Sequence, residues 1–383
     1  MSLLNRLGLF LVLCICTRSS NAAPLSITGK FQSWFPFYAE ELDAASVQCK
    51  PELEAYWSDG KNATIPYAPG TLCINAQSCL LDALPEYSIA NMGSSTVLLG
   101  LAPAILGLVG PTLPDTSVLM IQRPILSSLV LLGAPAMNPI TLFSNTNVED
   151  VLLLKPSAIM VALQRSILSW RTGQNGVKVR ISTWKTAIIS AAQYLLALAA
   201  VANTIHNTVM LDLGTSVSWR CSSFGLPLLW NTLSVPISWL AAIGLWYRVG
   251  SFNGRKGSDA QLRTNSRAFI RRFITSEHVP CLFQPQPAWN QQNVPPTVVS
   301  DLTYLAACLL LLVIYGFGTL VFSSLLFVAV NDSAIVLLRY AISACCCRFL
   351  LWFELESMRL WAGEKDDAEE LDMLSGGESH LQY

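Results

Sequence analysis

Histidine and cysteine are the side chains best suited to acid–base, nucleophilic or metal chemistry, and this chain arranges few of them productively. The histidines are His206, His278 and His380, and no two are spaced to bind one metal ion. Cys281 follows closely after His278, but a single pair of this kind is more often structural than catalytic. The sequence has no nucleophile elbow, no phosphate-binding loop and no nucleic-acid-binding module. We therefore predict no catalytic residue, metal site, cofactor or nucleic-acid partner, and no enzymatic activity.

A second set of polar side chains lies inside an apolar segment, where such groups are costly and often functional. These are Gln193, Asn203, His206 and Asn207. In a transporter they would contact a solute or a proton. In a structural role they would hydrogen-bond to neighbouring helices. We favour the structural role, because no acidic partner is evident in the middle of the segment.

The segment is one of four long stretches without Asp, Glu, Lys or Arg: Tyr87 to Pro114, Thr186 to Leu211, Cys221 to Tyr247, and Leu302 to Asn331. Each exceeds the roughly 20 apolar residues that cross a bilayer, where the backbone must be helical. A fifth candidate, Ser333 to Phe353, contains Arg339 and Arg348 near its ends, where arginine can reach the interface. The chain is 52% hydrophobic and only 13% charged. It is therefore predicted to be an all-α, polytopic transmembrane helical bundle, with spans near residues 92–113, 186–207, 226–247, 303–330 and 333–353.

The N-terminus resembles a cleaved signal peptide. An apolar run from Leu7 to Cys16 is too short to span, and Ser20-Asn21-Ala22 offers a cleavage site after residue 22. Residues 23–87 then form a small extracellular or luminal region. Asn62 begins an Asn-Ala-Thr glycosylation sequon in this region. The N-terminus is therefore expected outside, in a plasma membrane or a membrane of the secretory pathway.

Two basic loops set the orientation of the spans. One lies between the first two long stretches and the other between the third and fourth, and both should be cytoplasmic by the positive-inside rule. The second contains a stripe that could bind anionic lipids of the inner leaflet: Arg263, Arg267, Arg271 and Arg272. An ordinary positive loop is an equal alternative. The acidic residues 354–383 are expected to form a disordered cytoplasmic tail.

This orientation depends on the segment at residues 124–143. It is apolar and long enough to span, but a crossing there would place both basic loops outside. Pro124, Pro135 and Pro139 also interrupt helical hydrogen bonding. We favour a re-entrant or interfacial segment and five spans in total. A sixth crossing is the alternative.

The cysteines are consistent with five spans. Cys49, Cys73, Cys79 and Cys221 would all lie outside, an even number able to form two disulfides of open connectivity in an oxidising compartment. Near the opposite face, Cys345, Cys346 and Cys347 are candidates for lipidation, with apolar packing as the alternative.

Several runs carry a family resemblance: Leu99 to Gly110, Ala191 to Ala199, Phe317 to Phe327, Arg339-Tyr340 and Cys347-Arg348. With these runs, the region from Cys73 to Arg359 resembles a group of fungal multi-pass integral membrane proteins of unassigned function. The resemblance implies a membrane bundle and no activity.

Together these features predict a non-enzymatic integral membrane protein that senses, scaffolds or binds unknown protein partners. A transporter or channel is the alternative, and it requires a polar path through the bundle and broken helices.

Overall fold

In a computed structural model of the chain, the described residues are 30–58, 71–139, 158, 162, 183–221, 223–253, 277–283 and 298–377. The predicted signal peptide (residues 1–22), the sequon at Asn62 and the stripe Arg263, Arg267, Arg271 and Arg272 lie outside them. These three features stay predictions.

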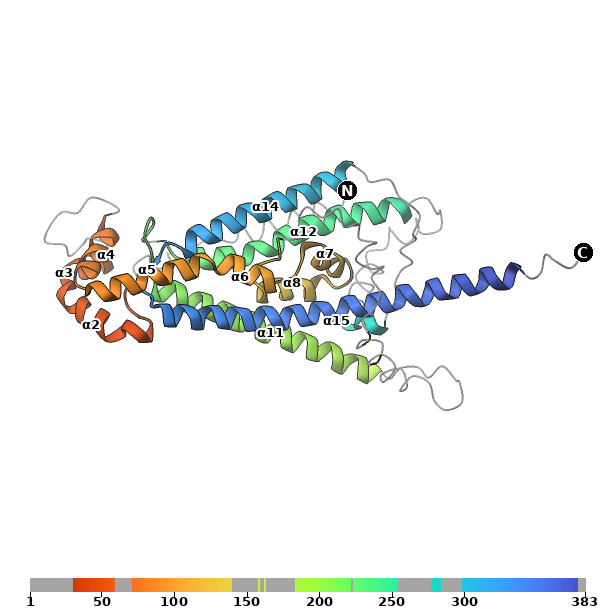
Figure 1. The fold of residues 1–383 in the computed structure, drawn as a ribbon, viewed down its shortest axis with the longest axis horizontal. Coiled ribbons are helices and arrows are strands. Elements are labelled where there is room, and N and C mark those ends of the chain that lie inside the picture. The colour runs from red at the N-terminus through yellow and green to blue at the C-terminus, as the bar shows by residue number, and fades with distance from the viewer. Residues whose placement is uncertain are drawn as a thin grey trace, which may run out of the picture.

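The chain forms an all-α bundle, as predicted. Five helical segments are long and apolar enough to cross a membrane: Glu86–Val109, Thr186–Gly214, Leu226–Leu245, Asp301–Phe322 and Val330–Arg359. They belong to α5 (Glu86–Gly100) with α6 (Ala102–Val109), α11 (Thr183–Gly214), α12 (Leu226–Asn253), α14 (Val298–Phe322) and α15 (Val330–Gly377). The helices run side by side along the length of the molecule (Figure 1).

Small elements gather at one end of the bundle. There lie η1 (Pro36–Tyr38), α2 (Ala39–Gln48), α3 (Lys50–Trp57) and α4 (Leu72–Asp82), which we call the head. Strand β1 (Ser216–Val217) pairs antiparallel with β2 (Leu325–Leu326) and joins two interhelical connections. We call this the disulfide end. The described C-terminus of α15 extends from the opposite end of the bundle (Figure 1).

Several span boundaries differ from expectation because a charge-free stretch does not mark where a helix stops. The first span begins at Glu86 and ends at Val109, before Gly110 and Pro111, rather than covering 92–113. Helix α14 ends at Phe322 instead of continuing to residue 330. Its chain turns through Phe327, whose positive φ of 68° is incompatible with a continuing right-handed helix.

The expected disordered tail is helical in the structure, since α15 continues without a break to Gly377. A helix that is already formed extends without a new nucleation cost, and the added stretch is rich in Glu, Ala, Leu and Met, which favour helix. The first residue assigned to the tail, Glu354, is in fact buried in the bundle.

The Pro-containing segment is not one long helix. Short helices α7 (Leu113–Gln122) and α8 (Pro124–Gly133) meet at Arg123, and the residues flanking the pair return to each other, with Asn138 N donating to Pro111 O at 2.8 Å. Ten residues of α8 rise only about 15 Å, half of a hydrocarbon core. Helix α8 therefore cannot cross by itself, which agrees with a re-entrant segment. Residues 140–157 lie outside the described part.

Candidate functional site: two buried polar junctions

The largest polar cluster in the bundle surrounds Arg123, at the corner between α7 and α8. Its Nη1 donates to Gln193 Oε1 at 2.6 Å and to Glu354 Oε1 at 2.8 Å. Its Nη2 donates to Ser190 Oγ at 3.0 Å and to the carbonyl oxygen of Glu277 at 2.9 Å. We call this cluster the Arg123 junction: Arg123, Ser190, Gln193, Tyr194, Glu277, Cys281 and Glu354.

The junction also holds a short segment of the connection between α12 and α14. The carboxylate of Glu277 accepts from Ile125 N at 2.7 Å and from the Tyr194 hydroxyl at 2.5 Å. A few residues later, in η3 (Cys281–Phe283), Cys281 N donates to Glu354 Oε2 at 3.0 Å. Four parts of the chain that are distant in sequence therefore meet at Arg123.

Burial dictates the chemistry of this junction. The side chains of Arg123 and Glu354 are both 0% exposed, and removing one partner of such a pair leaves an uncompensated buried charge. Arg123 also lies over the Tyr194 ring, with Cζ 5.5 Å from its centroid. Burial, reinforced by the Glu354 carboxylate, raises the pKa of the Cys281 thiol well above its usual range. The thiol is thus kept protonated and is a poor nucleophile.

Sequence reasoning found Gln193 but missed the rest of this junction. The expectation that Gln193 has no acidic partner is wrong, because its amide donates to Glu354 of α15. In the sequence, Arg123 directly precedes the apolar segment 124–143, and Glu354 is the first residue of the predicted tail. A usable signal existed: an arginine and a glutamate at the edges of two apolar segments are opposite charges that burial would force to pair.

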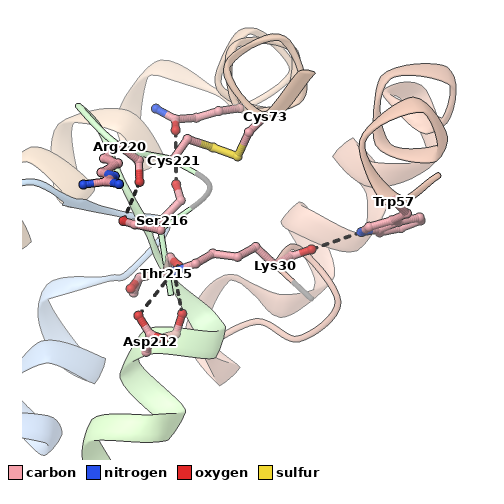
Figure 2. The surroundings of a disulfide bond; sticks show 10 residues. Lys30, Trp57, Cys73, Asp212, Thr215, Ser216, Arg220 and Cys221 are labelled. Atoms are coloured by element: carbon pink, nitrogen blue, oxygen red, sulfur yellow. Dashed lines mark hydrogen bonds and ion pairs between the residues drawn. A yellow bond between two sulfur atoms is a disulfide. The ribbon is translucent and has the colours of Figure 1, made fainter. Parts of the chain in front are cut away.

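A second junction lies at the disulfide end and ties the head to the bundle (Figure 2). Lys30 Nζ donates to the carbonyl oxygens of Asp212, at 2.9 Å, and of Thr215, at 3.1 Å. It also lies 3.4 Å from the Asp212 carboxylate, and both side chains are almost fully buried. A cation is favourable here because these carbonyls lie at the C-terminal end of α11. We call this the Lys30 junction.

The Lys30 junction extends to neighbouring elements. The other Asp212 oxygen accepts from Gly225 N at 2.8 Å, just before α12, and the carbonyl of Lys30 accepts from Trp57 Nε1 at 3.1 Å. Desolvation lowers the pKa of Lys30, and the charge of Asp212 opposes that shift. The Lys30 junction therefore connects α11, the start of α12 and the end of α3.

All four cysteines expected outside the membrane are paired, which supplies the connectivity that the sequence left open. Cys49–Cys79 joins the α2–α3 corner to α4 within the head, with Cα atoms 5.9 Å apart. Cys73–Cys221 joins α4 to the connection between α11 and α12, with Cα atoms 5.8 Å apart (Figure 2). The second bridge is a covalent tie between head and bundle.

The amides of the second span serve helix packing. Asn203 Nδ2 donates to Arg339 O and Ser343 Oγ, and Asn207 Nδ2 donates to Val336 O at 2.9 Å. Both partners lie on α15. His206 faces outward and is exposed. These contacts agree with the structural role favoured for the two asparagines.

One buried amide is different. Asn231 of α12 is 1% exposed, and neither its Oδ1 nor its Nδ2 has a hydrogen-bond partner among the described residues. It shares a helix face with Ser234 and Ser238, whose hydroxyls donate to Leu131 O of α8 and to Met137 Sδ just after α8. Sequence reasoning did not single out Asn231.

The remaining candidates lie apart from both junctions. Cys345 is exposed, Cys346 half-buried and Cys347 buried against Gly133, about midway between the ends of the span Val330–Arg359. Lipidation of these cysteines stays a prediction. Within the described residues, no three His, Cys, Asp or Glu side chains are grouped to hold a metal ion.

Comparison with protein-family models, with curated proteins and with solved structures finds no match to this chain. The resemblance to fungal multi-pass membrane proteins therefore stays a prediction.

Proposed function

We propose that this chain is a non-enzymatic integral membrane protein that senses, scaffolds or binds partners through its head, in a plasma membrane or a membrane of the secretory pathway. The head would lie outside, and the C-terminal helix would lie in the cytoplasm. Partners would be proteins on one or both sides, with anionic inner-leaflet lipids as a further partner of the basic stripe.

The observation that supports this proposal is the rigid attachment of the head. The Cys73–Cys221 bridge and the Lys30 junction fix it to α11 and α12, and Glu41 accepts from Ser88 Oγ of α5 at 2.6 Å. The polar side chains of the Arg123 junction are engaged with one another. A platform fixed in this way suits display or force transmission better than substrate turnover.

The head also presents apolar side chains that a partner could cover. Phe37 is 54% exposed, Val47 is 75% and Ile74 is 55%. Exposed apolar groups on a head domain are typical of protein–protein contacts when they form a patch.

Site-specific photo-crosslinking in cells tests the proposal. A photoreactive amino acid is placed at Phe37, Val47 or Ile74, with lipid-facing Leu309 of α14, 52% exposed, as the matched control. We expect a discrete protein adduct from at least one head position and none from Leu309. Absence of an adduct at all three head positions contradicts a partner on the head.

A transporter or channel is the second candidate, and one observation favours it. The α7–α8 pair breaks the helical backbone inside the bundle, and the unpartnered Asn231 is located on the face of α12 that packs against it. Broken helices and buried polar groups of this kind form the binding sites of many transporters.

Proteoliposomes containing the full chain test this candidate. Swelling in sorbitol, urea and sodium chloride is compared between the native chain and Asn231→Leu. Flux that depends on Asn231 would favour transport. Flux no greater than that of empty liposomes would favour the sensing or scaffolding role.

A further inference from the structure

The connection between α12 and α14 returns into the bundle. Residues Glu277–Phe283 comprise two helical residues, Glu277 and His278, and a single turn of 3-10 helix, and Glu277 is 5% exposed, Cys281 1% and Leu282 5%. Cys281 belongs to the apolar cluster built by α7, α8, α11 and α15. An interhelical connection would ordinarily lie on the surface, where its backbone groups can reach water. This connection is instead buried among α7, α8, α11 and α15.

The segment is held largely through polar contacts with bundle side chains. The carboxylate of Glu277 accepts hydrogen bonds from Ile125 N and the Tyr194 hydroxyl. Its carbonyl oxygen accepts from Arg123 and Ser190. Cys281 contributes its backbone N–H to Glu354. Apolar side chains also anchor it: Pro280, Cys281 and Leu282 are buried, and Val279 and Phe283 are partly buried.

Arg123 makes this attachment conditional. The same guanidinium that donates to the Glu277 carbonyl oxygen also donates to Glu354 and Gln193. The segment and the α11–α15 contact therefore share one cation. Hydrogen bonds to charged groups are individually strong, but each is lost completely when its partner moves away. A segment held in this way can leave as a unit once these hydrogen bonds are broken together.

We propose that residues Glu277–Phe283 form a releasable plug that closes the Arg123 end of the bundle and is held shut by Glu277, Tyr194, Arg123 and Glu354. Release exposes Cys281 and removes its hydrogen bond to Glu354, which stays paired with Arg123, while the five spans stay packed. The plug goes beyond the proposed function and does not depend on whether the protein senses, scaffolds or transports.

The reactivity of Cys281 reports the state of the plug. In the closed form the thiol is buried, and its raised pKa keeps the thiolate scarce, so alkylation by N-ethylmaleimide is slow. Cys347 is a matched internal control, since it is 0% exposed and belongs to the same apolar cluster but lies against Gly133 of α8. Peptide mass spectrometry of the full-length chain measures both cysteines in one sample.

The decisive variants are Tyr194→Phe and Glu277→Ala, each of which removes plug contacts and preserves the Arg123–Glu354 pair. Tyr87→Phe is the control variant, because it removes a similar tyrosine–glutamate hydrogen bond, to Glu41, at the disulfide end. We expect Cys281 to be alkylated about tenfold faster in both plug variants than in the native chain or the control. Alkylation of Cys347 should stay unchanged.

Two results would overturn the plug. If neither variant accelerates alkylation of Cys281, the segment is not held by these contacts. If Cys281 and Cys347 accelerate together, the segment is part of the cooperative core and opens only with general unfolding.

Discussion

Individual buried charges carry much of the specificity of this protein. Arg123 with Glu354 and Lys30 with Asp212 lie at opposite ends of the bundle, and in each pair a charged side chain joins parts of the chain that are distant in sequence. Such pairs add little net stability compared with apolar packing, but they penalise any arrangement that separates them. They therefore fix which helix neighbours which.

Asn231 is the residue whose burial is least compensated. With both amide atoms unpartnered among the described residues, it incurs a desolvation cost without a hydrogen bond in return. We predict that Asn231→Leu raises the free energy of unfolding by about 1–3 kcal/mol, measured by SDS titration in mixed micelles.

Asn207→Leu is the matched control for that substitution. It removes the hydrogen bond to Val336 O, so it should lower the free energy of unfolding by about 1 kcal/mol. If Asn231→Leu destabilises the protein as Asn207→Leu does, then Asn231 has a partner, such as a bound water, that stabilises the native bundle.

The sequence predicted the polar residues within a span better than it predicted their partners. Asn203 and Asn207 could be recognised because they interrupt an apolar run at helical spacing. Arg123 and Glu354 lie at the edges of such runs, where a charge normally means solvent. Their pairing is a tertiary fact that depends on how α8 and α15 dock, and no local pattern encodes it.

Helices α12 and α14 illustrate how elements achieve close packing. Trp230 of α12 is 2% exposed and contacts Phe322 edge-on, with ring centroids 4.9 Å apart. Its indole lies directly against Gly318 of α14, where a Cβ would overlap the ring nitrogen. Gly316, two residues earlier, meets only open space. Small residues in this helix thus have different roles.

We predict opposite effects for alanine at these two glycines. Gly318→Ala should lower the free energy of unfolding by about 1–3 kcal/mol, because the rigid, buried indole has to shift. Gly316→Ala should be neutral or raise it by up to about 1 kcal/mol through helix propensity. The same SDS titration measures both, and equal effects would mean that the α12–α14 contact differs from the one described here.

The elements themselves were largely predictable. Five spans follow from stretches of apolar residues long enough to cross a bilayer, and the four outer cysteines follow from their placement between those stretches. The ends of the helices were less predictable. Helix α14, for example, ends where its chain turns at Phe327 and β2 pairs with β1, which is distant in sequence. The helical continuation of α15 was missed because acidic composition alone suggested disorder.

At the scale of the whole molecule, the number of spans decides whether the two ends of the chain face the same compartment. The head lies at the disulfide end, whereas α15 extends past the opposite end of the bundle (Figure 1). Five crossings therefore require the head and the C-terminus to face different compartments. A sixth crossing, by residues 124–143, would place them on the same side.

Thiol labelling in sealed microsomes, whose cytoplasmic face points outward, distinguishes these arrangements. The variants carry Val47→Cys on the exposed surface of α2, a cysteine added after Tyr383, or Leu309→Cys on the lipid-facing side of α14 as a control. An impermeant maleimide should label the C-terminal cysteine in intact microsomes and Val47→Cys only after detergent opens them, because reagent and head are separated by the membrane. Labelling of both in intact microsomes would establish an even number of crossings, and labelling of Val47→Cys alone would reverse the orientation. Leu309→Cys should resist labelling in intact microsomes, since a charged reagent does not enter the hydrocarbon core.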